Sequence, residues 1–139
     1  MSSHLLDSNP IASQFDRLPP HSIDAEMCVL GSMMLDKEQI GVVAQILQDK
    51  DAFFQTDHQL IYEALLSLYN SGKNIDPIIL RAELEKRKVL EEVGGTVYLA
   101  QIVNTVPSAA HAAHYAQIVR EKYMLRQLIA ASNDILREA

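Results

Sequence analysis

Five residues could take part in metal or thiol chemistry. His111 and His114 are three residues apart in a predicted helix, a spacing at which two imidazoles can share a metal ion. A metal site needs three or four ligands, and no cysteine or carboxylate pair stands nearby, so we interpret both as solvent-facing. His21 and His58 each stand beside a predicted helix start, where we expect local contacts. The single cysteine, Cys28, lies among apolar residues and is expected in the core.

Nucleotide chemistry has one superficial candidate, the segment Ser71-Gly72-Lys73-Asn74. A phosphate-binding loop needs a glycine five residues before Gly72, where this chain has Ser67, and a Ser or Thr where it has Asn74. The glycine also closes a predicted helix, whereas a phosphate loop opens one. No Ser–His–Asp or Cys–His arrangement emerges from the order of residues either. The sequence therefore predicts no catalytic residue, cofactor or metal site in this chain.

The basic cluster of Arg81, Lys86, Arg87 and Lys88 leaves two interpretations open. It can contact DNA phosphates, or it can complement the negative C-terminal end of a helix. The overall charge favours the second, because 12 Lys and Arg face 18 Asp and Glu, a net charge of −6. Phosphate binding usually needs a basic surplus. We expect DNA binding by this domain to be weak or absent.

The length and composition are those of one soluble domain. The 139 residues are enough for a modest core. One cysteine excludes an internal disulfide, no apolar run approaches the roughly 20 residues that span a bilayer, and the first residues lack the apolar segment of a signal peptide. These features predict a cytoplasmic protein with no membrane partner.

Helix signals follow one another from Ser22 onward with almost no strand-like alternation, which predicts an all-α fold. Residues 1–20 are polar and aperiodic and predict a flexible tail. Caps and breakers give the other boundaries. The first helix is expected after Ser22, the second from a capping box of Asp36 and Gln39, and the third from Asp57 to Ser71-Gly72, after a connector with Phe53 and Phe54. The fourth is expected from Asp76-Pro77 to the basic cluster, the fifth after Gly94-Gly95 and the last from Ser108 to about Glu138.

The last predicted helix is long for so small a domain, roughly 45 Å at about 1.5 Å per residue. Its apolar residues fall on two lines, one with Ile118, Leu125, Leu128 and Ile135 and the other with Tyr115, Val119, Ile129 and Leu136. A helix that is apolar on two sides needs neighbours on two sides. Because the chain stops at Ala139 without a helix cap, we interpret it as a fragment of a larger architecture.

The order of short motifs over residues 17–139 resembles the amino-terminal domain of the bacterial replicative DNA helicase, the DnaB family. Many blocks agree in series, which makes the resemblance more specific than any single motif. The matching blocks are Arg17-Leu18-Pro19-Pro20-His21-Ser22-Ile23-Asp24-Ala25-Glu26, Val29-Leu30-Gly31-Ser32-Met33, Phe53-Phe54, His58, Leu60-Ile61-Tyr62, Asn74-Ile75-Asp76-Pro77, Leu90-Glu91-Glu92-Val93-Gly94-Gly95, Tyr98-Leu99, Val106-Pro107-Ser108-Ala109-Ala110, Tyr115-Ala116-Gln117-Ile118-Val119-Arg120-Glu121-Lys122 and Leu125-Arg126-Gln127-Leu128-Ile129.

The resemblance implies a globular helical head over residues 21–106 and, over 107–139, the first helix of a helical hairpin. In this family the heads form dimers and then a trimer-of-dimers collar on a hexameric helicase ring, and the collar docks the helicase-binding carboxy-terminal domain of primase. ATP and Mg²⁺ belong to a separate carboxy-terminal ATPase domain, which this chain lacks. A helicase loader is a further expected partner, and DNA binding is expected of the full-length ring.

The same resemblance implies which residues contact a partner. Positions carried over for primase are Asp24, Tyr98, Ile129 and Ile135; Tyr115, Val119 and Leu125 complete the set expected at the primase, dimer or collar interface. Hairpin or dimer packing is the alternative for each, because apolar helix stripes usually serve packing. The function predicted is non-catalytic assembly and primase docking within a helicase that unwinds DNA in the 5′–3′ direction. The alternative is a stand-alone helical adaptor or loader-like regulator.

Overall fold

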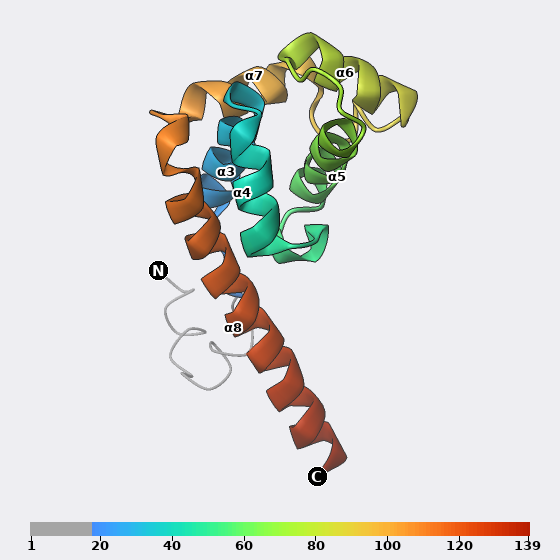
Figure 1. Cartoon of the computed structure of the whole chain (residues 1–139). Helices are drawn as coiled ribbons and strands as arrows, with labels where there is room; N and C mark the ends of the chain where they lie inside the picture. Colours follow the sequence, from blue (N-terminus) through green and yellow to red (C-terminus); the bar gives the residue numbers. More distant parts are fainter. Residues whose placement is uncertain (1–17) are drawn as a thin grey trace, which may run out of the picture.

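The computed structural model describes residues 18–139, which form helices and connecting turns without a strand in that range, and the predicted all-α fold is confirmed. Figure 1 shows a head of short helices from which one long helix projects, with the C-terminus at its far end. The elements are α3 (Ile23–Leu35), α4 (Glu38–Leu47), the 3₁₀ turn η1 (Lys50–Ala52), α5 (Thr56–Asn70), α6 (Pro77–Lys86), α7 (Gly95–Thr105), the 3₁₀ turn η2 (Ala109–His111) and α8 (Ala112–Glu138).

Helix α3 is the centre of the head. Ser22 caps it by accepting the backbone N–H of Ala25, as the sequence predicts. Every residue from Ala25 to Met34 is buried, because α4, α5, α7 and α8 all pack against this helix. At Gly31 the backbone of α7 comes so close that an added Cβ would lie 2.8 Å from a carbonyl oxygen of α7. Only glycine permits this approach.

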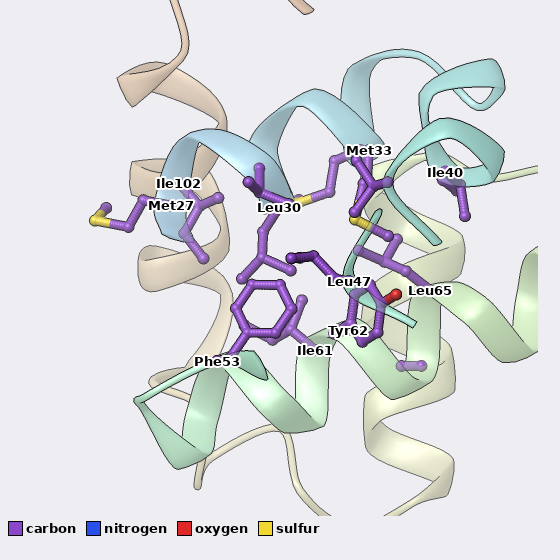
Figure 2. Close-up of a cluster of buried hydrophobic side chains, with 14 of the residues drawn as sticks. Met27, Leu30, Met33, Ile40, Leu47, Phe53, Ile61, Tyr62, Leu65 and Ile102 are labelled. Carbon is purple, nitrogen blue, oxygen red and sulfur yellow. The ribbon is translucent and has the colours of Figure 1, made fainter. Parts of the chain in front are cut away.

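The apolar core is centred between α3, α4 and α5, includes the connector before α5 and takes in buried side chains of α6, α7 and α8. Figure 2 shows Phe53 beside Tyr62 below α3, and the two ring centroids are 4.9 Å apart. Cys28 is buried at the edge of this core, as expected, and burial raises the pKa of its thiol. The largest fully buried side chains are Tyr62, Phe53, Leu30, Met33, Ile40, Ile61, Leu65, Leu80, Leu84, Ile102, His58 and Glu26.

Most of the predicted helix boundaries are confirmed within a residue or two. Asp76 caps α6 through the N–H of Ile79, 2.8 Å away. Asp36 differs from the predicted capping box, because its own N–H already donates to Ser32 at the end of α3. Its carboxylate accepts the Glu38 N–H and the Gln39 side-chain amide instead. Two starts also differ: α5 begins at Thr56, one residue before Asp57, and Ser108 caps η2 through the N–H of Ala110, so that α8 follows from Ala112.

The boundary expected at residue 107 does not separate α8 from the head. Ala112, Ala116 and Val119 on its first turns are buried in the head core, whereas every residue from 127 onward is exposed. Residues 1–17 of the predicted tail lie outside the described residues. Within residues 18–139 no helix is long and apolar enough to cross a membrane.

Candidate docking surface

Two arginines attach α8 to the head. Arg126 donates from Nη1 to the carbonyl oxygen of Pro20 and from Nη2 to that of Ala52, both at 2.8 Å. Its guanidinium lies 5.6 Å from the ring centroids of Phe54 and Tyr123. Burial lowers the pKa of Arg126, while the charges of Glu26 and Tyr123 oppose that shift. These bonds fix the angle at which the helix leaves the head.

Arg120 is the second attachment, and its Nη1 donates to the carbonyl oxygen of Ile46 at 3.0 Å. This bond and those of Arg126 each join residues more than 70 positions apart, so no local pattern in the sequence predicts them. Among residues 18–139, the last part of α8 has one ion pair, the local one between Arg137 and Asp134.

The far part of α8 carries an exposed apolar surface. Leu125, Ile129 and Ile135 are 45%, 46% and 67% exposed. Three further apolar side chains share this stretch: Met124, Leu128 and Leu136. We call these six residues the α8 apolar surface. Such a series on one element is typical of a surface that is covered when a partner binds.

The burial of the two apolar lines predicted for the last helix changes along the length of the helix and not from one line to the other. Tyr115 and Ile118 are half-buried against the core and Val119 is buried, so both lines pack on the head at their start. Further along, both lines are exposed. Tyr115 and Val119 therefore lie in or against the head core, and Val119 is only 1% exposed and offers almost no surface to a partner.

The two head residues expected at a partner interface differ in their settings. Asp24 is exposed in the first turn of α3. Tyr98 on α7 is half-buried, and its hydroxyl points inward to His58. The structure thus gives Tyr98 a buried partner that the sequence analysis did not predict.

That partner belongs to a buried polar chain of Glu26, His58 and Tyr98. The Glu26 carboxylate accepts the N–H of Phe54 at 2.7 Å and that of Gln55 at 3.4 Å. His58 Nδ1 donates to Glu26 Oε1 at 2.7 Å, and its Nε2 is 2.6 Å from the Tyr98 hydroxyl. Glu26 is 1% exposed and His58 is fully buried. A buried charge is tolerated only when it is paired in this way.

The prediction of local contacts is confirmed for His21, which bonds to the Pro19 carbonyl, and is wrong for His58. His58 bonds to residues 32 and 40 positions away, as described above. His21 stacks on Phe54 with ring centroids 4.2 Å apart, besides its local bond to the Pro19 carbonyl. One sequence signal was available: Glu26 stands between apolar residues that all become buried, so its charge required a partner.

Two further candidates remain: His111 with His114, and the basic cluster. His111 and His114 are both exposed, and among residues 18–139 no group of three or more His, Cys, Asp or Glu side chains is placed to hold a metal ion. In the basic cluster, Arg87 pairs with Glu83 at 2.7 Å and Arg81 Nε lies 3.6 Å from Glu85. The hydrogen bond from Arg87 lowers the pKa of Glu83. These acids on the same helix offset the positive charge of α6.

The fold defines an all-helical domain with a long helix that arginine side chains attach to the head. Over residues 18–121 the chain matches the DnaB-like helicase N-terminal domain, and it belongs to that family. It is 40% identical over 132 residues to the replicative DNA helicase DnaB of Mycobacterium leprae and 42% identical over 123 residues to the replicative DNA helicase DnaC of Bacillus subtilis. These matches take in 95% and 88% of this chain but 22% and 27% of the relatives, so the chain spans about a quarter of their length.

Solved structures agree with the family. The crystal structure of the N-terminal domain of DnaB helicase from Mycobacterium tuberculosis superposes with a TM-score of 0.84 at 40% identity, covering 86% of each chain. The N-terminal domain of DnaB helicase from Helicobacter pylori shares the fold, with a TM-score of 0.70 at 23% identity over 83% of this chain and 89% of that one.

Proposed function

We propose that this chain is the assembly and docking domain of a bacterial replicative DNA helicase and acts by binding rather than by catalysis. The observation that carries the proposal is the exposed α8 apolar surface, which lies on a helix that Arg126 attaches to the head. Apolar area of this kind costs free energy in water and favours a partner that covers it. Its relatives over the same region are replicative DNA helicases.

The partners we propose are a second copy of the chain and the carboxy-terminal helicase-binding domain of primase. The structure of the Helicobacter pylori relative was described together with its interactions with primase. On this chain the contacts would be Leu125, Ile129 and Ile135 of α8, with Asp24 and Tyr98 on the head. Self-association would build the dimers and the collar of the hexamer, and docked primase would couple priming to unwinding.

The other activities of such a helicase are proposed to lie outside this chain. ATP and Mg²⁺ would bind the ATPase domain of the full-length protein, and single-stranded DNA would pass through its ring. The offset charges of α6 support weak DNA binding at most. A helicase loader is a further proposed partner, and the protein would act in the bacterial cytoplasm.

Calorimetric titration of this chain with the helicase-binding domain of primase tests the proposal. Fully burying an isoleucine is worth about 1.5–3 kcal/mol, and Ile129 is 46% exposed, so covering it is worth about 1 kcal/mol. Ile129→Ala should therefore weaken binding about 5-fold. Ile78→Ala is the matched control, because Ile78 is exposed on α6, away from α8. If primase binding and self-association both survive Ile129→Ala unchanged, the proposal is wrong.

A further inference from the structure

The chemistry of Glu26 fixes the direction of the hydrogen bonds that its carboxylate accepts. A carboxylate only accepts, and its three neighbours are the N–H groups of Phe54 and Gln55 and Nδ1 of His58. His58 must therefore carry a proton on Nδ1. In the neutral imidazole that tautomer leaves Nε2 as an acceptor. The Tyr98 hydroxyl, 2.6 Å from Nε2, donates to that neutral tautomer, whereas an imidazolium would donate from Nε2 to the hydroxyl oxygen; in both cases the hydroxyl is bonded inward to His58.

The Tyr98 ring is held on further sides. It stacks on the His58 imidazole with an angle of 5° between the ring planes and 5.8 Å between centroids. On another side lies Gly94, where an added Cβ would be 2.7 Å from the Tyr98 Cβ. Burial and the charges of Asp57 and Glu26 raise the pKa of the Tyr98 hydroxyl, while a hydrogen bond with the Gln55 side chain opposes this shift, so the hydroxyl keeps its proton.

We propose that Glu26 and His58 are positioning residues for docking: they fix the Tyr98 ring at the head surface with its hydroxyl turned inward. The partner then meets a preorganised aromatic ring beside the exposed Val97. Because the hydroxyl is already bonded, the partner group that fits this place is an apolar side chain. The inference rests on the proposed function, in which Tyr98 belongs to the docking surface.

The loss of affinity expected in variants follows from the cost of immobilising the Tyr98 ring when the partner binds. A side chain that must be immobilised on binding weakens affinity about 2- to 10-fold. Tyr98→Phe keeps the ring but removes the bond that fixes it, so it should weaken binding by that factor. Glu26→Gln should do the same, because one of the two oxygens becomes an NH2 group that cannot accept, and the Phe54 N–H and His58 Nδ1 then compete for the single remaining oxygen. Since both act through one chain of bonds, the double variant should be no weaker than the stronger single variant.

The test is a double-mutant cycle, with affinity for the helicase-binding domain of primase measured by calorimetry at a temperature where all variants are folded. Tyr69→Phe, a half-buried tyrosine at the other end of α5, is the matched control and should leave binding unchanged. In parallel, nitrogen-15 NMR of the His58 ring should show a protonated Nδ1 in wild type and in Tyr98→Phe, and loss of that single tautomer in Glu26→Gln. A merely structural role would change melting temperature in these variants without weakening binding.

The outcomes separate the two proposals. If wild type binds and Ile129→Ala weakens binding, but Tyr98→Phe and Glu26→Gln bind as wild type does, the positioning role is overturned and the docking function stands. Additive losses in the double variant overturn it as well, because independent effects do not share a chain of bonds. No binding by wild type removes both proposals.

Discussion

Replacing Glu26 by alanine removes the acceptor on which three parts of the head converge. The carboxylate sits on α3 and bonds to the connector before α5 through Phe54 and Gln55, and to α5 itself through His58. No water reaches this carboxylate freely, since Glu26 is 1% exposed. Glu26→Ala therefore leaves buried donors without partners, and it also leaves a small cavity.

The loss of stability in Glu26→Ala follows from the hydrogen-bond donors that the variant leaves without an acceptor. Each buried donor left unpaired costs about 1–3 kcal/mol. The Phe54 N–H and His58 Nδ1, both at 2.7 Å, count fully, whereas the Gln55 N–H at 3.4 Å is a weak bond. We expect Glu26→Ala to lower the free energy of unfolding by about 3–5 kcal/mol. That is a large share of the roughly 5–15 kcal/mol that stabilises a typical domain.

Urea unfolding followed by far-ultraviolet circular dichroism measures this difference. The matched control is Glu92→Ala, because Glu92 is exposed in the turn before α7 and should change stability by less than about 0.5 kcal/mol. The melting temperature of Glu26→Ala should also fall, by about 10–20 °C. A loss below about 1 kcal/mol would show that water or a rearranged backbone satisfies these donors, and the reasoning on the buried chain would be refuted.

Three further changes follow from single contacts. Tyr62→Phe should stabilise the head by about 1 kcal/mol, because the Tyr62 hydroxyl is buried without a hydrogen-bond partner among the described residues. Burial raises the pKa of this hydroxyl from 10.0 to about 12, so the wild-type protein should lose stability as pH rises between these values and the variant should not. A variant that is destabilised in urea unfolding would contradict both points. Gly31→Ala should lower the free energy of unfolding by about 1–3 kcal/mol, because the added Cβ forces α7 away from α3. Gly41→Ala is the control and should lower it less, because its added Cβ meets the end of a tyrosine side chain. Equal melting temperatures of the two variants would count against this packing. Arg126→Lys should lower the free energy of unfolding by about 1–2 kcal/mol and speed hydrogen exchange in α8. Arg137→Lys, at an exposed ion pair, is the control and should change both little. Unchanged hydrogen exchange in Arg126→Lys would mean that Arg126 does not anchor the helix.

The sequence predicted what depends on near neighbours. Caps such as Ser22 and Asp76 act within three residues, so their side chains and the helix start appear together in the sequence. The burial of Cys28 likewise follows from its apolar neighbours in the sequence. Asp36 shows the limit of this local reasoning, because its N–H is used by the preceding helix and not by a capping box.

The candidate site was predicted only in part for the same reason. The over-long apolar helix was visible, and with it the exposed Leu125, Ile129 and Ile135. Which part of that helix the head covers depends on packing against α3 and α4, which no local pattern encodes. The pairing of Glu26 with His58 joins residues 32 positions apart, and a buried charge in a sequence signals only that some partner must exist.

A chemical-shift map of the chain on addition of the helicase-binding domain of primase tests the central claim most directly. The proposed docking surface predicts that shifts change at the exposed residues of α8 and around Tyr98, while the backbone amides of α6 stay unperturbed. Changes centred on α6, or no change at all at saturating primase domain, would contradict a docking surface on α8.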